Sequence, residues 1–233
     1  MKKEGDRMAR DVVCDSSAII SLTDACLAHV FYFLREKAGA RFIVPNSVVQ
    51  ECVDKPLHIP NRDYRFSALK IKDMLNDRIL EKVDADVAGK TQELGKVANS
   101  LFFARGRPLR LVQAGELEMA ALAGELGVGS VLMDERTMRL LIEAPMNLKD
   151  HLEKELRVNI MVNRENLEKL QELTKGITVV RSTEALIVAY EKGFLKHFDE
   201  IEKEVAEAAL YRLKSAGCAI SFREIEEYIK GVA

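Results

Sequence analysis

Hydrophobic positions along the first 135 residues follow two spacings in turn. Short apolar runs, typical of strands buried on both faces, are separated by stretches in which apolar residues recur at helical spacing. This alternation predicts an α/β fold with a mostly parallel sheet and helices on both of its faces. The predicted strands are 11–14, 41–45, 79–85 and 129–134, and the predicted helices are 17–38 (broken near Thr23 and Asp24), 47–53 (capped by Asn46), 66–77, 86–104 and 116–127.

Two loops interrupt this alternation. Residues 54–65 contain two prolines and several basic residues, and residues 105–115 contain three arginines. Proline and glycine in these stretches favour irregular backbone. We therefore predict that the chain leaves regular structure at both places.

The character of the chain changes near residue 144. Residues 144–176 are highly charged and mainly helical, and 177–180 predict one more strand. Ser182 is a candidate cap for a helix over 183–193, because a serine hydroxyl can accept a bond from a free N–H of the first helical turn.

Two further helices are expected after that point, over 197–215 and 221–231. Ser221 and Glu224 have the spacing of a capping box, in which each side chain bonds to the backbone of the other residue.

Composition narrows the class of protein. Hydrophobic residues make up 48% of the 233 residues, which suffices for a full core, and the formal net charge is −2, so that any nucleic-acid binding must rest on a local basic patch. The charged start and the lack of a long apolar run predict a soluble, cytoplasmic protein without a membrane partner. The four cysteines, Cys14, Cys26, Cys52 and Cys218, have no CxxC spacing and predict reduced thiols. Cys14, Cys26 and Cys52 lie in apolar segments, where a free thiol packs as a small hydrophobe.

The segment "VVCDSSAIISL" ends an apolar strand in one carboxylate and two hydroxyls, Asp15, Ser16 and Ser17. One interpretation is a helix cap, since aspartate and serine favour that position. The other is a metal site, because ligands gather at the carboxyl ends of parallel strands. The segment alone leaves both open.

Three other acidic positions favour the metal interpretation. Glu51 lies in the helix after the second strand, Glu116 opens the alanine-rich helix, and Asp134 follows the strand at 129–134. Each of them alone has an ordinary explanation as a solvated or capping residue. Together with Asp15 they predict a cluster of carboxylates, which a divalent cation would neutralise, and oxygen-only ligands suit Mg²⁺ or Mn²⁺.

The segments "VVCDSSAIISL", "FIVPNSVVQECV" and "AGELEMAALAGELGVGSVLMDE" together resemble the PIN-domain family, which includes VapC-like ribonucleases. The last segment is similar to the branch with a GExE helix and a DE or DD pair at the end of the next strand. The resemblance implies a PIN-like three-layer α/β/α fold with a mostly parallel central sheet. It divides the chain into a nuclease core (1–143), a helical insertion (144–176), the last strand and helix of the core (177–195) and a C-terminal helical extension (196–233).

The resemblance implies a Mg²⁺- or Mn²⁺-dependent ribonuclease. Asp15, Glu51, Glu116 and Asp134 match the four acidic positions of the family in order and would be the catalytic residues. Asp15, Glu116 and Asp134 would bind the metal, while Glu51 would bind it or orient the attacking water. Glu116 departs from the more usual aspartate by one methylene. Further metal ligands would be Glu118 and Glu135, and the supporting hydroxyls would be Ser16 and Ser17.

An RNA substrate would need cations beside this acidic edge. Lys55, Arg62 and Arg65 flank the helix after the second strand, and five arginines near the last two acidic positions are the predicted RNA contacts: Arg105, Arg107, Arg110, Arg136 and Arg139. The resemblance also implies an antitoxin or other protein partner, as in toxin–antitoxin pairs, and a homodimer.

Two other functions compete with the nuclease. A catalytically weak or inactive PIN-like module could bind RNA or protein through the charged helices of 144–176 and 196–231, which exceed what a minimal nuclease needs. A small-molecule phosphatase or transferase would need a glycine-rich phosphate loop, and the sequence contains none.

Overall fold

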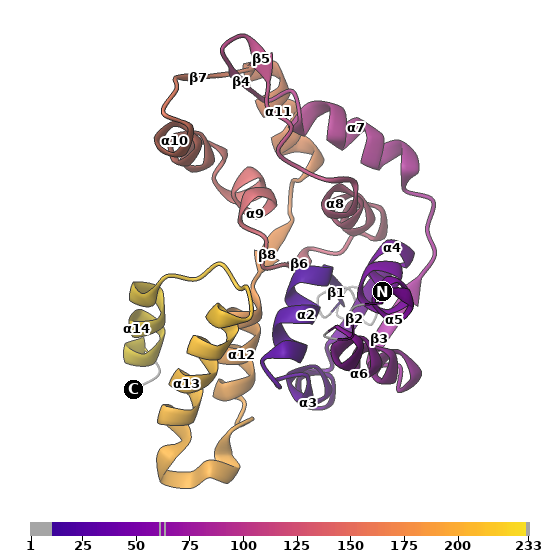
Figure 1. Ribbon diagram of the computed structural model, residues 1–233, viewed down its shortest axis with the longest axis vertical. Helices are drawn as coiled ribbons and strands as arrows, with labels where there is room; N and C mark the ends of the chain where they lie inside the picture. The colour runs from indigo at the N-terminus through magenta and orange to yellow at the C-terminus, as the bar shows by residue number, and fades with distance from the viewer. Residues whose placement is uncertain (1–10, 61, 63, 232–233) are drawn as a thin grey trace, which may run out of the picture.

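The computed structural model describes residues 11–60, 62 and 64–231. Its centre is a five-stranded, all-parallel sheet in the order β3-β2-β1-β6-β8 (Figure 1). The predicted α/β class is therefore confirmed, and each predicted strand is present. The strands of this sheet are β1 (Asp11–Cys14), β2 (Arg41–Pro45), β3 (Leu80–Val83), β6 (Ser130–Leu132) and β8 (Thr178–Val180).

The register of β1 and β6 brings two predicted site segments to one edge of the sheet. Cys14 pairs with Leu132, so that both strands end at the same level. The backbone N–H of Asp15 then donates to the carbonyl of Leu132 at 2.9 Å. Asp15 and Asp134 therefore lie at neighbouring strand ends, because parallel strands share their carboxyl edge.

Helices cover both faces of the sheet, an arrangement compatible with three α/β/α layers. On one side α8 contacts β1, β2 and β6, and on the other α2 packs with α6 and α12 (Figure 1). Strands covered on both sides need apolar residues throughout, which explains the continuous apolar runs. The helices of this part are α2 (Ser16–Asp24), α3 (His29–Ala38), α4 (Asn46–Val49), α5 (Lys55–His58), α6 (Arg65–Asn76), α8 (Ala114–Leu126), α9 (Arg136–Glu143) and α12 (Ser182–Glu191).

A second, antiparallel sheet joins the segment 144–176 to an earlier part of the chain. β4 (Phe102–Ala104) pairs with both β5 (Arg107–Pro108) and β7 (Ile160–Val162). The helix predicted over 86–104 is therefore wrong at its end, and the loop predicted over 105–115 contains β5. The helices around this sheet, at the top of Figure 1, are α7 (Ala88–Ala98), α10 (Pro145–Leu156) and α11 (Arg164–Leu173).

The C-terminal extension is held by a buried arginine. The extension consists of a 3₁₀ turn η2 (Lys196–Ile201), α13 (Glu202–Ser215) and α14 (Phe222–Gly231). Arg181, just before α12, donates to Glu184, to Glu224 at 2.8 Å and to the carbonyl of Ala219 at 3.1 Å. The predicted capping box is confirmed: Ser221 and Glu224 bond to each other's backbone N–H at 2.8 and 3.1 Å.

Three local predictions are wrong. Asn46 is the first residue of α4 and not its cap, and the side chain makes no capping bond. The helix continues past 54 through the π-helix η1 (Gln50–Asp54) into α5, so that Pro56 lies within the helical run and does not end it. Ser182 does not cap α12, because it is the first residue of that helix, and the backbone N–H of Arg181 before it donates to Glu184 at 2.7 Å.

The cysteines and the helices bear on two composition-based predictions. All four thiols are free, but Cys26 is exposed in the turn after α2 and does not pack as a core residue.

Within the described ranges no single helix is long and apolar enough to cross a bilayer, and α2 with α3 reaches that length only as a pair bent by 110°. Both members of that pair contribute side chains to the core, among them Ile19, Leu22, Val30 and Phe31.

Candidate active site

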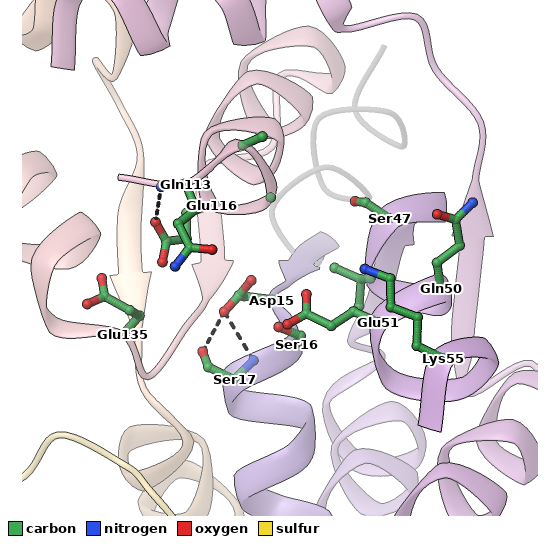
Figure 2. A pocket seen from close by; sticks show the side chains of 13 residues that line it. Asp15, Ser16, Ser17, Ser47, Gln50, Glu51, Lys55, Gln113, Glu116 and Glu135 are labelled. Carbon is green, nitrogen blue, oxygen red and sulfur yellow. Dashed lines mark hydrogen bonds between the residues drawn. The ribbon is translucent and has the colours of Figure 1, made fainter. Parts of the chain in front are cut away.

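A cavity of about 430 Å³ opens at the carboxyl edge of the main sheet. Four carboxylates from four separate segments line it: Asp15, Glu51, Glu116 and Glu135 (Figure 2). The neutral polar side chains around them include Ser16, Ser17, Gln50 and Gln113. The cavity thus combines an excess of anionic oxygen with hydroxyl and amide groups.

Asp15 has two roles. It caps α2, since its Oδ2 accepts the backbone N–H of Ser17 at 3.1 Å and the hydroxyl of Ser17 at 2.5 Å. Its side chain also faces the cavity, although the residue is only 5% exposed. Burial raises the pKa of Asp15, the Ser17 bonds counteract this, and the nearby Glu51 adds to the rise. The two interpretations of the opening segment are therefore both compatible with one side chain.

Glu51 is presented by an unusual piece of helix. It lies in η1, a π-helical stretch that interrupts the run from α4 to α5. π-Helical segments are rare and occur mostly as single turns within α-helices, frequently at functional sites. Glu51 and Gln50 of this stretch, together with Lys55 at the start of α5, lie on the wall of the cavity opposite Glu116 (Figure 2).

Glu116 lies at the third position of α8. Its Oε2 accepts the backbone N–H of Gln113 at 2.8 Å, which completes a capping box with the Gln113 side chain. Burial raises the pKa of Glu116, the Gln113 bond opposes the rise, and the carboxylates of Glu135, Asp15 and Glu51 add to it. The resulting pKa is about 7, so that this carboxyl group exchanges a proton near neutral pH.

Glu135 completes the acidic wall. One of its oxygens accepts the backbone N–H of Met138 at 2.6 Å and caps α9. The sequence allowed Asp134 to be this cap, and the structure gives the role to the next residue. Glu135 was predicted as an additional ligand, and it lies on the cavity wall.

Asp134 is not on the cavity wall. It is 2% exposed, and both of its carboxylate oxygens accept bonds from Ser182, one from the backbone N–H and one from the hydroxyl, each at 2.8 Å. Its backbone N–H donates to the hydroxyl of Ser17 at 3.0 Å. The predicted fourth metal ligand is therefore directed at the start of α12 and joined to Asp15 only through Ser17.

Glu118 lies away from the cavity as well. Two residues along a helix from Glu116, it points into a separate hollow formed with residues 85–88, Thr91 and Gln92. Residues two apart on a helix do not share a face. The structure therefore does not bring Glu118 to the other predicted ligands.

The predicted RNA-contacting arginines are scattered. Arg105 and Arg107 form the exposed end of the β4–β5 hairpin, far from α2 in Figure 1. Arg139 on α9 lies 3.9 Å from Glu143, and Arg136 is exposed at the start of the same helix. None of the five, Arg110 included, lines the cavity.

The described lining contains one cation, Lys55, which is among the basic residues predicted to flank the acidic edge but is not one of the five predicted RNA contacts. Lys55 is the first residue of α5, and its ammonium group reaches over the wall that carries Glu51 (Figure 2). Ser182 was predicted as a cap but not as a partner of Asp134. Both roles depend on side-chain directions, which hydrophobic spacing does not encode.

The donor chemistry of the cavity suits a hard divalent cation. Its four carboxylates offer oxygen ligands only, as Mg²⁺ and Mn²⁺ prefer. Within the described part of the chain, no three His, Cys, Asp or Glu side chains already converge on one point.

Comparisons of the chain with protein-family models, with curated proteins and with solved structures give no match.

Proposed function

We propose that this protein is a Mg²⁺- or Mn²⁺-dependent ribonuclease with a PIN-like fold. One observation carries the proposal: carboxylates from four segments share one cavity at the carboxyl edge of a parallel sheet. Burial, and to a lesser extent the neighbouring carboxylates, raise the pKa values of Asp15 and Glu116, so that keeping these groups charged is unfavourable without a counter-charge. A divalent cation would relieve that repulsion.

Asp15, Glu51 and Glu116 are the residues that would hold the ion, with Glu135 beside them. When bound, such an ion supplies charge neutralisation at a phosphate and acidifies water. Asp134 serves the site indirectly, because its N–H fixes Ser17, and Ser17 fixes Asp15.

A cavity carboxylate that does not hold the ion would take the proton of the attacking water. The water oxygen forms a bond to phosphorus, the P–O ester bond breaks, the water proton passes to that carboxylate, and the leaving oxygen takes a proton from solvent.

A second function is favoured by one specific observation. Because Ser182 occupies both oxygens of Asp134, one of the four acidic positions that the PIN resemblance implies is directed away from the cavity. That arrangement would suit a catalytically weak PIN-like module that binds RNA or protein. The antitoxin partner and the homodimer stay predictions.

Cleavage of labelled RNA separates these two functions. We expect the purified protein to cleave with Mn²⁺, to lose cleavage with chelator, and to lose at least 100-fold in rate as Asp15→Asn or Glu116→Gln, in line with the loss of charge stabilisation in an active site. Glu118→Gln is the matched control, because Glu118 belongs to the same helix but lies in a different hollow. RNA binding without cleavage by any form would favour the binding module.

A further inference from the structure

The small antiparallel sheet of β5, β4 and β7 exposes one of its two faces. Phe103 in the middle strand pairs with Pro108 on one side and with Met161 on the other. Cross-strand partners project from the same face of a sheet, so that these three side chains form one apolar row. Met161 is 58% exposed, Pro108 is exposed and Phe103 is half-buried, whereas Phe102 on the opposite face is fully buried. The row is therefore an apolar surface that the fold of one chain leaves largely open to solvent.

The strands that form this row carry cations without carboxylates. Between Glu93 and Glu116 the sequence has four basic residues and no acidic one, and between Glu155 and Glu165 it has two arginines and no acidic residue. Residues 105 and 106 both have positive φ, 50° and 75°, a turn conformation that favours asparagine and glycine, yet the first of them is an arginine. In a chain of net charge −2, this concentration of arginine favours an acidic partner. We call the apolar row, together with the five arginines in or near these strands in sequence, the hairpin surface: Arg105, Arg107, Arg110, Arg157 and Arg164.

A segment of opposite charge lies at the other end of the molecule. The turn that joins α12 to α13 is at the bottom of Figure 1, and the β4–β5 hairpin is at the top. Residues 198–207, which run from η2 into α13, contain five acidic residues and one lysine. Two large apolar side chains of this segment are exposed, Phe198 at 38% and Ile201 at 55%. Residues 198–207, the acidic segment, are therefore opposite to the hairpin surface in charge and similar to it in apolar character.

A protein surface fits the apolar row better than a nucleic acid does. Phosphates bind to cations and need no apolar row, and bases stack on aromatic rings, which Met161 and Pro108 do not have. Methionine, by contrast, adapts its shape to the side chains of a protein partner. The row therefore favours a partner that has exposed apolar residues among its carboxylates, as the acidic segment does.

We infer that the hairpin surface of one copy of this chain binds the acidic segment of a second copy. The two surfaces lie at opposite ends of one molecule, so that they cannot meet within a single chain (Figure 1). A pair of copies joined in this way keeps one surface of each kind free. The contact is therefore heterologous, and association continues beyond two copies. It does not depend on the proposed nuclease function.

Sedimentation velocity of the full chain over about a hundredfold range of protein concentration, with chelator and without RNA, tests the inference. We expect the average mass to rise with concentration past that of a dimer and to fall as salt is added, because salt screens exposed charges. Two variants each reverse the charge of one surface: Arg105→Glu/Arg107→Glu and Glu200→Lys/Glu204→Lys. Each variant should stay monomeric alone. An equimolar mixture of the two should associate again, since the mixture offers opposite charges at each contact.

The mixture distinguishes a lost contact from a lost fold, because a second variant does not restore an unfolded one. Lys169→Glu/Lys175→Glu is the matched control, since it reverses two exposed lysines on and just after α11 and should associate as the wild type does. A wild type that stays monomeric overturns the inference, as does a dimer that grows no further or that neither charge reversal affects. A monomeric wild type whose Arg105→Glu/Arg107→Glu variant loses binding of a fluorescent RNA stem-loop would also overturn the inference and would assign the hairpin surface to nucleic acid.

Discussion

Ser182 holds both carboxylate oxygens of Asp134, through its backbone N–H and its hydroxyl, each at 2.8 Å. Both residues are almost fully buried. The bond pair ties the end of β6 to the start of α12, and Ser17 continues the connection to Asp15. The acidic residue after β6 therefore links the sheet edge to the C-terminal helices in addition to any part it has in chemistry.

Asp134→Ala should lower the free energy of unfolding by about 2–4 kcal/mol, because it leaves two buried donors of Ser182 without an acceptor. Asp134→Asn should cost only about 1 kcal/mol, since its carbonyl can accept the N–H while its amide donates to the Ser182 hydroxyl. Urea denaturation measures both. Equal losses in the two variants would contradict the hydrogen-bond assignment.

Asp15 offers a way to separate capping from chemistry. Asparagine also caps helices well, so that Asp15→Asn should keep the fold and abolish metal-dependent cleavage. Asp15→Ala should in addition lower the free energy of unfolding by about 1 kcal/mol through loss of the cap. Thermal unfolding and RNA cleavage are measured on both variants. Full cleavage activity of Asp15→Asn would contradict a role of the Asp15 charge in catalysis.

Much of the fold could be predicted from the sequence, because buried parallel strands leave an unmistakable apolar pattern. The strands around 11–14 and 41–45 and the helix ending at Gly127 were predicted nearly to the residue. β4 and β7 could not be predicted, since each has three residues and β7 pairs only with β4, across a long sequence separation. Asp15, Glu51, Glu116 and Glu135 followed from strand ends and helix starts. The burial of Asp134 could not, because it depends on a tertiary partner, Ser182.

The metal-free protein should be more stable at pH 6 than at pH 8. The pKa of Glu116 is raised from 4.5 to about 7 in the folded state, so that its contribution is fully present below 4.5 and is lost as pH rises through 7. The raised pKa of Asp15 acts in the same direction. Glu116→Gln should reduce this difference in urea denaturation, and an unchanged difference would contradict the assignment.

Arg181 should be the anchor of the C-terminal extension. Arg181→Met removes the partner of Glu184 and Glu224 from a nearly buried site and should cost about 3–5 kcal/mol in urea denaturation. Arg223→Met is the control, because its ion pair with Glu227 is exposed and should contribute less than about 1 kcal/mol. A small loss in both variants would contradict the anchoring role.

The ion pair of Arg181 with Glu224 predicts that the free energy of unfolding falls in acid. Burial alone would raise the pKa of Glu224, but its bonds with Ser221 and Arg181 outweigh burial and lower the pKa to about 2. Its stabilising contribution is present above 4.5 and is lost as pH falls toward 2. Glu224→Gln should therefore flatten the decline of stability below pH 4.5, which denaturation across that range measures.

Titration of Mn²⁺ into the protein, followed by electron paramagnetic resonance, tests the central claim most directly. We expect one Mn²⁺ to bind in the cavity, about tenfold tighter at pH 8 than at pH 6, because Glu116 must lose its proton. Glu51→Gln and Glu116→Gln should bind Mn²⁺ much more weakly, and Glu118→Gln should bind it as the wild type does. Absence of binding by the wild type, or equal weakening by Glu118→Gln, would contradict a metal site in the cavity and leave Asp15 as the cap of α2.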